Sequence, residues 1–294
     1  MRKQVILWLC TVLLVLVGCQ SAASSSSQTS TTTSSVPATS AQSSESKSVV
    51  ETVSDETEAL IAAAEQGQPT IEDKYTVEDG ILYYGGAEVT EEQKTFDFRE
   101  SNLVDYSFLK DYSWVEHLLI EDDALVDLDF LRDCTSLKSL TLTCGASDFQ
   151  VIGELSKLEN LTLQSPNLTD LNFLSNLSLN FLLCSYCDSL NDISSLEGMS
   201  SLSFLSLFEC GAIEDFSVLP SLTGLEQLYL SGTTFDDLTL IESLSTLSTL
   251  GIEGCAVDYE LFASASYSLQ TLRSDADAET EAWLEELFPG CEFT

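Results

Sequence analysis

Positive charge and histidine are scarce in this 294-residue chain. It has 11 Lys and Arg against 48 Asp and Glu, a formal net charge of −37 at pH 7, and a single histidine, His117. These counts exclude nucleic acid as a partner, because a phosphate backbone is bound by clustered basic residues. One histidine also excludes metal sites built from several histidines and leaves at most one His-based catalytic triad. The acidity predicts a soluble, self-repelling surface.

Long apolar runs are also lacking, apart from residues 5–17. That run follows the positive residues Arg2 and Lys3, and its thirteen residues are typical of a secretory signal and too short to span a membrane. It ends in Leu16-Val17-Gly18-Cys19, which resembles the lipobox of bacterial lipoproteins at all four positions. An ordinary secretory signal that happens to carry a cysteine is the alternative.

The lipobox resemblance implies removal of residues 1–18 and acylation of Cys19. Small Gly18 would admit the signal peptidase, and the Cys19 thiol would take up diacylglycerol. Two or three acyl chains anchor a protein durably, whereas one is marginal. The implied location is the extracytoplasmic face of a bacterial cell membrane, with the lipid on Cys19 as the membrane contact.

Residues 19–70 have the composition of a tether. Ser and Thr dominate, with Ser30–Ser35 an unbroken Ser/Thr run, and residues 20–50 contain no aromatic residue. No core can form from such a segment, so we expect a flexible chain spanning roughly 40 Å. Tethers of this kind indicate a Gram-positive source. A short helix is predicted over residues 54–66, capped by Ser54 or Asp55.

The pattern L-x-x-L-x-L recurs through the rest of the chain. Complete copies start at residues 115, 137, 158, 179, 202, 225 and 247, an incomplete copy starts at 269, and Phe96 and Phe98 fit a leading copy. Alternating apolar residues predict a short strand with one buried side, and apolar residues later in each copy predict a helical or 3₁₀ turn. No copy buries its leucines alone, so the copies must stack.

This period of about 22 residues resembles the internalin type of leucine-rich repeat, over residues 93–272. The resemblance implies an α/β repeat solenoid: a leucine-rich-repeat horseshoe with a parallel concave sheet, short helical or 3₁₀ convex segments and terminal caps. Strands at Ile81–Tyr84 and Ala87–Val89 predict a capping hairpin, and Glu279–Phe288 predicts a capping helix followed by a last strand. The predicted domains are a signal peptide at 1–18, a tether at 19–70, an N-terminal cap hairpin at 71–92, repeats at 93–272 and a C-terminal cap at 273–294.

One aspartate recurs in each copy, just ahead of the convex turn. A calcium ladder and helix N-caps are the two interpretations, and calcium needs several oxygens converging on one point. The placement before an apolar residue favours N-caps, so no metal site and no cofactor are predicted. The column comprises Asp105, Asp127, Asp148, Asp170, Asp192, Asp215 and Asp237.

Cys187, Cys210 and Cys255 occupy the bend that follows the strand in their copies. Repeats of the internalin type place Asn there, and the resemblance implies buried free thiols that cap backbone carbonyls. Exported proteins often pair their cysteines, so disulfides stay open as an alternative. We place the remaining cysteines in the core (Cys184), on the helical face (Cys134), at the concave edge (Cys144) and in the C-terminal cap (Cys291).

The favoured function is a cell-surface module that binds a protein or peptide on its concave face. Burying the strand leucines forces the alternating side chains outward, and in the middle copies these are apolar and aromatic. Such a patch is typical of protein interaction sites. The candidate binding residues are Phe181, Leu183, Tyr186, Phe204, Phe208 and Tyr229.

Two other functions stay open. A self-associating structural spacer is one. The other is a hydrolytic enzyme around His117, with Asp97 one strand away and Ser139 in the neighbouring strand. No nucleophile elbow or phosphate loop accompanies His117, so a non-catalytic protein is expected.

Overall fold

The computed structural model describes residues 75–99, 101, 103–264 and 267–294, which belong to the unit Ala63–Thr294. The predicted signal peptide, Ser/Thr-rich tether and helix at 54–66 lie outside these residues. Among the helices of the described ranges, none has the length and apolar character of a membrane span.

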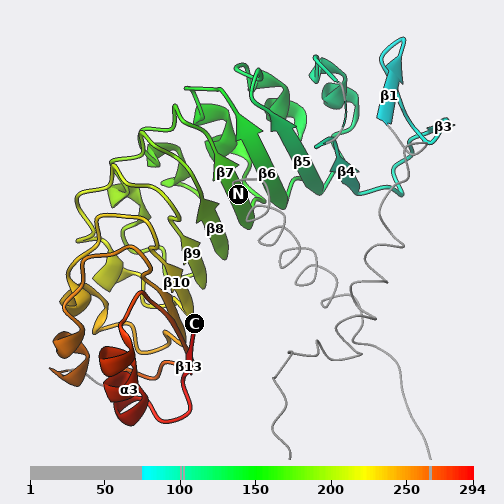
Figure 1. The fold of residues 1–294 in the computed structure, drawn as a ribbon. Coiled ribbons are helices and arrows are strands. Elements are labelled where there is room, and N and C mark those ends of the chain that lie inside the picture. The colour runs from blue at the N-terminus through cyan, green and yellow to red at the C-terminus, as the bar shows by residue number, and fades with distance from the viewer. Residues whose placement is uncertain (1–74, 100, 102, 265–266) are drawn as a thin grey trace, which may run out of the picture. The chain divides into compact units, whose positions relative to one another are not determined.

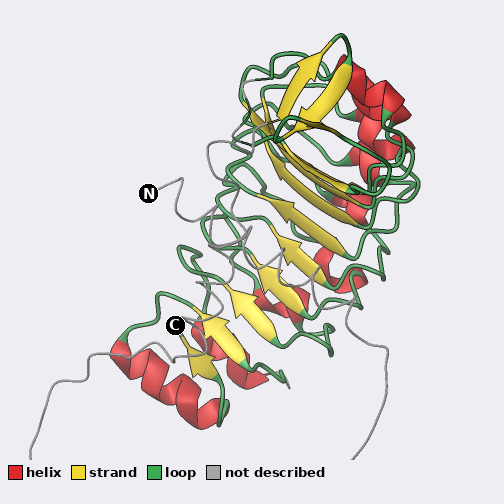
Figure 2. Ribbon diagram, turned by 90° about the vertical axis from the view of Figure 1, so that its right-hand side faces the viewer, coloured by secondary structure: helices red, strands yellow, loops and turns green. Residues whose placement is uncertain are grey.

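Ten parallel strands form one sheet whose strand order follows the chain. They line the inner side of a curve, and short helical turns run along its outer side (Figures 1 and 2). This is the predicted leucine-rich-repeat solenoid, in which each repeat packs on its two neighbours. The strands are β4 (Thr95–Asp97), β5 (His117–Asp122), β6 (Ser139–Cys144), β7 (Asn160–Gln164), β8 (Phe181–Cys184), β9 (Phe204–Ser206), β10 (Gln227–Tyr229), β11 (Thr249–Gly251), β12 (Thr271–Arg273) and β13 (Glu292–Phe293).

The strand register builds the core as columns of identical positions. One column runs through the second residue of successive strands, and each of its members from β4 to β12 is fully buried. Stacking therefore removes from water the leucine side that a single copy would expose. The members are Phe96, Leu118, Leu140, Leu161, Leu182, Leu205, Leu228, Leu250 and Leu272.

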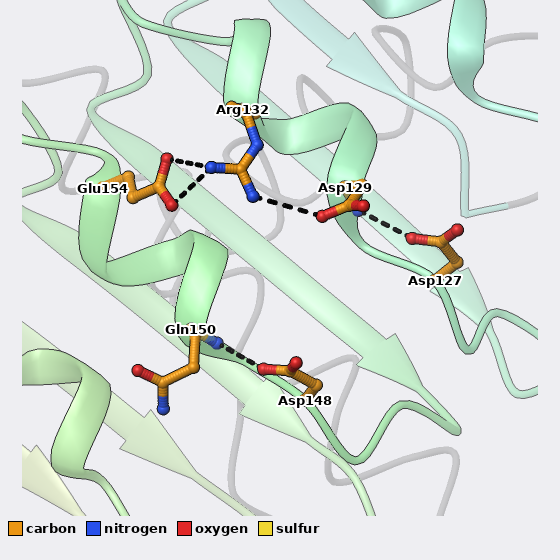
Figure 3. A network of polar contacts seen from close by, with 6 residues as sticks. All are labelled: Asp127, Asp129, Arg132, Asp148, Gln150 and Glu154. Carbon is orange, nitrogen blue, oxygen red and sulfur yellow. Dashed lines mark hydrogen bonds and ion pairs between the residues drawn. The ribbon is translucent and has the colours of Figure 1, made fainter.

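Short 3₁₀ helices of three to six residues form the turns on the outer side of the repeats. An aspartate two residues ahead accepts a hydrogen bond from the first amide of a turn, as Asp127 does from Asp129 and Asp148 from Gln150 (Figure 3). The turns are η2 (Ser107–Asp111), η3 (Asp129–Asp133), η4 (Gln150–Glu154), η5 (Asn172–Leu174), η6 (Ser194–Leu196), η7 (Leu219–Ser221), η8 (Leu238–Ile241) and η9 (Tyr259–Ser264).

The aspartate column therefore binds backbone amides at or near the starts of the turns, as the N-cap interpretation predicted in kind. The predicted position is confirmed for Asp237 alone, because ahead of η2 to η6 the aspartate stands one residue before the N-cap. All seven predicted aspartates accept the amide two residues on, at 2.8 to 3.0 Å. Asp258 adds an eighth cap ahead of η9, at 3.0 Å. No group of three or more His, Cys, Asp or Glu in the described residues is placed to hold a metal ion. Figure 3 also shows Arg132 bridging Asp129 of its own turn and Glu154 of the next.

Asp192→Ala is expected to lower the free energy of unfolding by about 1 kcal/mol, because the Ser194 amide loses its 2.9 Å acceptor. Asp192→Asn keeps an acceptor oxygen and should lose much less. Hydrogen bonds from the hydroxyl and amide of Ser194 lower the pKa of Asp192. The contribution of Asp192 to the free energy of unfolding is therefore full at neutral pH and disappears as the pH falls through that lowered pKa. Urea unfolding from pH 7 to pH 2 measures this; an alanine effect independent of pH would contradict it.

The two ends of the stack carry the predicted capping elements with two differences. The N-terminal sheet has three antiparallel strands, because β1 (Tyr75–Glu78) joins β2 (Ile81–Tyr84) and β3 (Ala87–Glu88). The C-terminal helix α3 (Ala278–Leu287) begins one residue earlier than predicted, where Asp277 accepts the Thr280 amide at 2.8 Å. The last strand, β13, pairs with β12 and extends the sheet.

Candidate functional site

The concave face is built by side chains that alternate with the buried leucines. On β8 and β9 the register places Phe181 beside Phe204, and the next outward position pairs Leu183 with Ser206. Ser206 in turn lies beside Tyr229 on β10. The predicted direction of these side chains, away from the leucines between them, is confirmed.

The aromatic cluster comprises Phe181, Leu183, Tyr186, Phe204, Phe208 and Tyr229. Phe181 and Phe204 stack face to face, with ring centres 4.2 Å apart and planes 14° apart. Phe204 continues to Tyr229 at 5.4 Å, and Tyr186 meets Phe208 edge to face at 5.5 Å. None of the six belongs to the hydrophobic core of the solenoid. The rings thus form a second apolar cluster on the opposite side of the sheet.

The prediction that all six side chains are exposed is wrong for three of them. Phe181 and Phe204 are each 8% exposed, and Leu183 is 4% exposed. Stacked rings cover one another, which an argument from alternation along one strand does not include. Tyr186, Phe208 and Tyr229 are half-buried and present the accessible part of the cluster.

Tyr229 depends on the glycine of the next strand. A Cβ at position 251 would come within 2.7 Å of the Tyr229 ring, so the ring occupies space that only Gly251 leaves open. From β12, Arg273 places its guanidinium carbon 5.9 Å from the centre of the same ring, at cation–π distance. Burial raises the pKa of Tyr229, and the charge of Arg273 partly offsets that rise.

The residues of the alternative catalytic site are not joined into a triad. His117 and Ser139 do lie side by side on β5 and β6, but Asp97 pairs with Leu119, one column away. The Asp97 carboxylate is held by Arg99 at 2.6 Å. Within the described residues no hydrogen bond connects His117 with either partner. Burial lowers the pKa of His117, which leaves it a neutral polar residue on the concave face at pH 7.

Cys187, Cys210 and Cys255 occupy the bend positions as predicted, and every cysteine in the described part of the chain is free. The sulfurs of Cys187, Cys210 and Cys255 approach backbone carbonyl oxygens of the preceding repeat at 3.8, 3.6 and 3.2 Å. Burial raises the pKa of the Cys134 thiol to about 12, so that thiol is not ionised at neutral pH. The prediction of Cys144 at the concave edge is wrong: it is 1% exposed, because alternation along β6 places it on the same inward side as Leu140 and Leu142.

Sequence reasoning missed the second half of the site, formed by Gly251, Glu253 and Arg273. The available signal was charge, because Arg273 is the only Lys or Arg after Lys157. The Arg273 Nε is buried and has no hydrogen-bond partner in the described part of the chain. This end of the concave face therefore combines an aromatic ring with the only Lys or Arg of residues 158–294.

Comparison with solved structures confirms the fold class. Internalin C2 of Listeria monocytogenes is 21% identical, with a TM-score of 0.54 over 65% of this chain and 87% of that chain. A chain of the Toll–Spatzle complex of Drosophila is 17% identical, with a TM-score of 0.51 over 66% of this chain and 28% of that chain. No protein-family model and no curated protein matches the sequence. The chain is a leucine-rich-repeat solenoid, and the two similarities extend to its fold alone.

Proposed function

We propose that this protein is a non-catalytic, lipid-anchored module of the bacterial cell surface that binds a protein or peptide on its concave face. The observation that carries the proposal is the aromatic cluster on β8, β9 and β10, which lies outside the core. Aromatic side chains dominate the energetic centres of protein interfaces. A structural spacer needs only the core columns and the caps, and gains nothing from a row of rings on the sheet face.

Site-directed photo-crosslinking on living cells tests the proposal. A photoreactive residue replaces Phe208 in the full chain, and the matched control replaces Glu214, an exposed residue on the outer side. Crosslinks to another protein from position 208 and not from position 214 support a concave binding site. Crosslinks from position 208 to a second copy of this chain identify a self-associating spacer instead. Equal crosslinking from both positions, or none from 208, contradicts the proposal.

The anchor is the second part of the proposal and rests on the sequence Leu16-Val17-Gly18-Cys19. Acylation of Cys19 would hold the tether, and with it the repeats, at the outer face of the membrane. The Ser/Thr-rich residues would then set how far the concave face reaches from the lipid surface.

Cys19→Ala is expected to leave an unprocessed precursor that still carries residues 1–18, because the acylated thiol is what the peptidase recognises in proteins with this box. The wild-type chain should partition into a detergent phase as a processed, acylated form, measured by phase separation and mass spectrometry. Cys10→Ala, in the same signal segment, is the matched control and should leave processing intact. Equal release of wild type and Cys19→Ala into the medium would refute the anchor.

A further inference from the structure

Charge is distributed unevenly between the two halves of the repeat stack. Residues 158–294 contain 22 Asp and Glu and one cation, Arg273. The ion pairs between described residues lie earlier in the chain: Arg99–Asp97, Arg132–Asp129, Arg132–Glu154 and Lys138–Glu116. The aromatic cluster therefore lies in the half of the molecule that provides almost no cations of its own.

Two carboxylates lie along a row of left-handed residues that follow strands β8 to β11. Residues 186, 209, 232 and 254 all have left-handed backbone, and two of them are Gly232 and Gly254. The Glu209 carboxylate lies over Gly232, where a Cβ would meet its Cδ at 2.8 Å. On the other side, Asp275 accepts the Gly254 amide at 2.5 Å. Gly232 and Gly254 carry no side chains of their own, and the Glu209 carboxylate occupies the space above Gly232.

A third carboxylate connects this row to the aromatic cluster. Glu253 accepts a hydrogen bond from Ser231. A Cβ added at Gly251 would lie 2.7 Å from the Tyr229 ring and 3.5 Å from a Glu253 oxygen. The ring and the carboxylate thus border the same spot on the concave face, and Glu209 directly follows Phe208 in the chain.

The guanidinium of Arg273 shows that this surface can hold a cation against an aromatic ring. It lies over Tyr229 at 5.9 Å, beside the carboxylate-lined row. Rings with carboxylates at their edges favour cations, because the ring face and the carboxylate attract the same charge. The Tyr186–Phe208 pair, whose ring centres are 5.5 Å apart, places a second aromatic surface next to the carboxylate of Glu209 in the chain.

We infer that the partner of the concave face presents a basic, extended polypeptide segment. This inference rests on the proposed function. Apolar side chains of that segment would pack on the aromatic cluster, and its Lys or Arg side chains would face Glu209, Glu253 and Asp275. Charge complementarity accelerates such an encounter and rejects acidic partners.

Binding of the detergent-purified full chain to an array of random dodecapeptides tests the inference. Peptides that bind should be enriched in Lys or Arg next to apolar residues, and replacing their basic residues by Gln should weaken binding by about tenfold or more at low salt. The double variant Glu209→Gln with Glu253→Gln should weaken the binding of basic peptides about fivefold. Glu197→Gln with Glu214→Gln, which removes the same charge from the outer side, should change binding less than about twofold.

The outcomes separate this inference from the function on which it rests. If the peptides that bind are neutral or acidic, and Phe208→Ala weakens their binding, the concave site stands and the inference of a basic partner is overturned. If both double variants weaken the binding of basic peptides equally, net charge alone holds the peptides, and the inference is also overturned. Binding that Phe208→Ala does not change, or an array that retains no peptide, overturns the concave site as well.

Discussion

Replacement of Leu205 by alanine is expected to cost about 2–5 kcal/mol of folding free energy through the cavity that it leaves. Leu205 is fully buried on β9, in register with Leu182 and Leu228 of the neighbouring strands. For a unit of this size the melting temperature should fall on the order of 10 °C. Leu205→Asp should unfold several repeats together, since it buries a charge in a core that neighbouring repeats share.

Val104→Ala is the control for this prediction. Val104 is 95% exposed, so removing two methyl groups there should change stability by less than about 0.5 kcal/mol. Calorimetry or urea unfolding of the full chain measures all three variants. Unchanged melting of Leu205→Ala would mean that the strand leucines do not point inward.

The double variant Phe204→Ala with Tyr229→Ala is expected to weaken partner binding more than tenfold for each strong anchor, or about 1.4 kcal/mol per factor of ten. It removes two adjoining rings of the aromatic cluster, whose centres are 5.4 Å apart. Because Phe204 is 8% exposed and stacks on Phe181, the variant should also lose roughly 2 kcal/mol of stability. Binding must therefore be measured well below the melting temperature.

Phe216→Ala separates the two effects of that variant. Phe216 is 5% exposed and packs edge to face on Phe235, outside the sheet face. Its loss should lower stability by a similar amount and leave binding unchanged. If both variants weaken binding equally, the loss reflects instability, and the concave centre is not the site.

The period of the leucines predicted every inward column of the sheet, because side chains alternate along a strand and a repeated spacing aligns like with like. The aspartate column was predictable for a similar reason, since a carboxylate ahead of a short turn has a free amide within reach. Both are local rules applied many times. The strand β1 was missed although Asp79-Gly80 is a turn signal, and both residues adopt left-handed backbone there.

Contacts between side chains on different strands were beyond such local rules. The alternation places Phe181 and Phe204 on the concave side but does not show that one ring covers the other. Arg273 and Tyr229 lie 44 positions apart in the chain, and their contact depends on the absence of a side chain at Gly251 between them. Burial of Cys144, by contrast, was within reach of the local rule, because Cys144 follows Leu140 and Leu142 at the same alternation along β6.

The sequence by itself thus determined the solenoid, its core columns and its capped turns, because each of these repeats every 21 to 23 residues and depends on residues close in the chain. The tertiary structure alone decided which concave rings are covered, where the carboxylates of β9 to β12 gather, and which of them border Tyr229. Those properties arise where neighbouring repeats differ from one another, and the differences act only after stacking has brought the strands side by side.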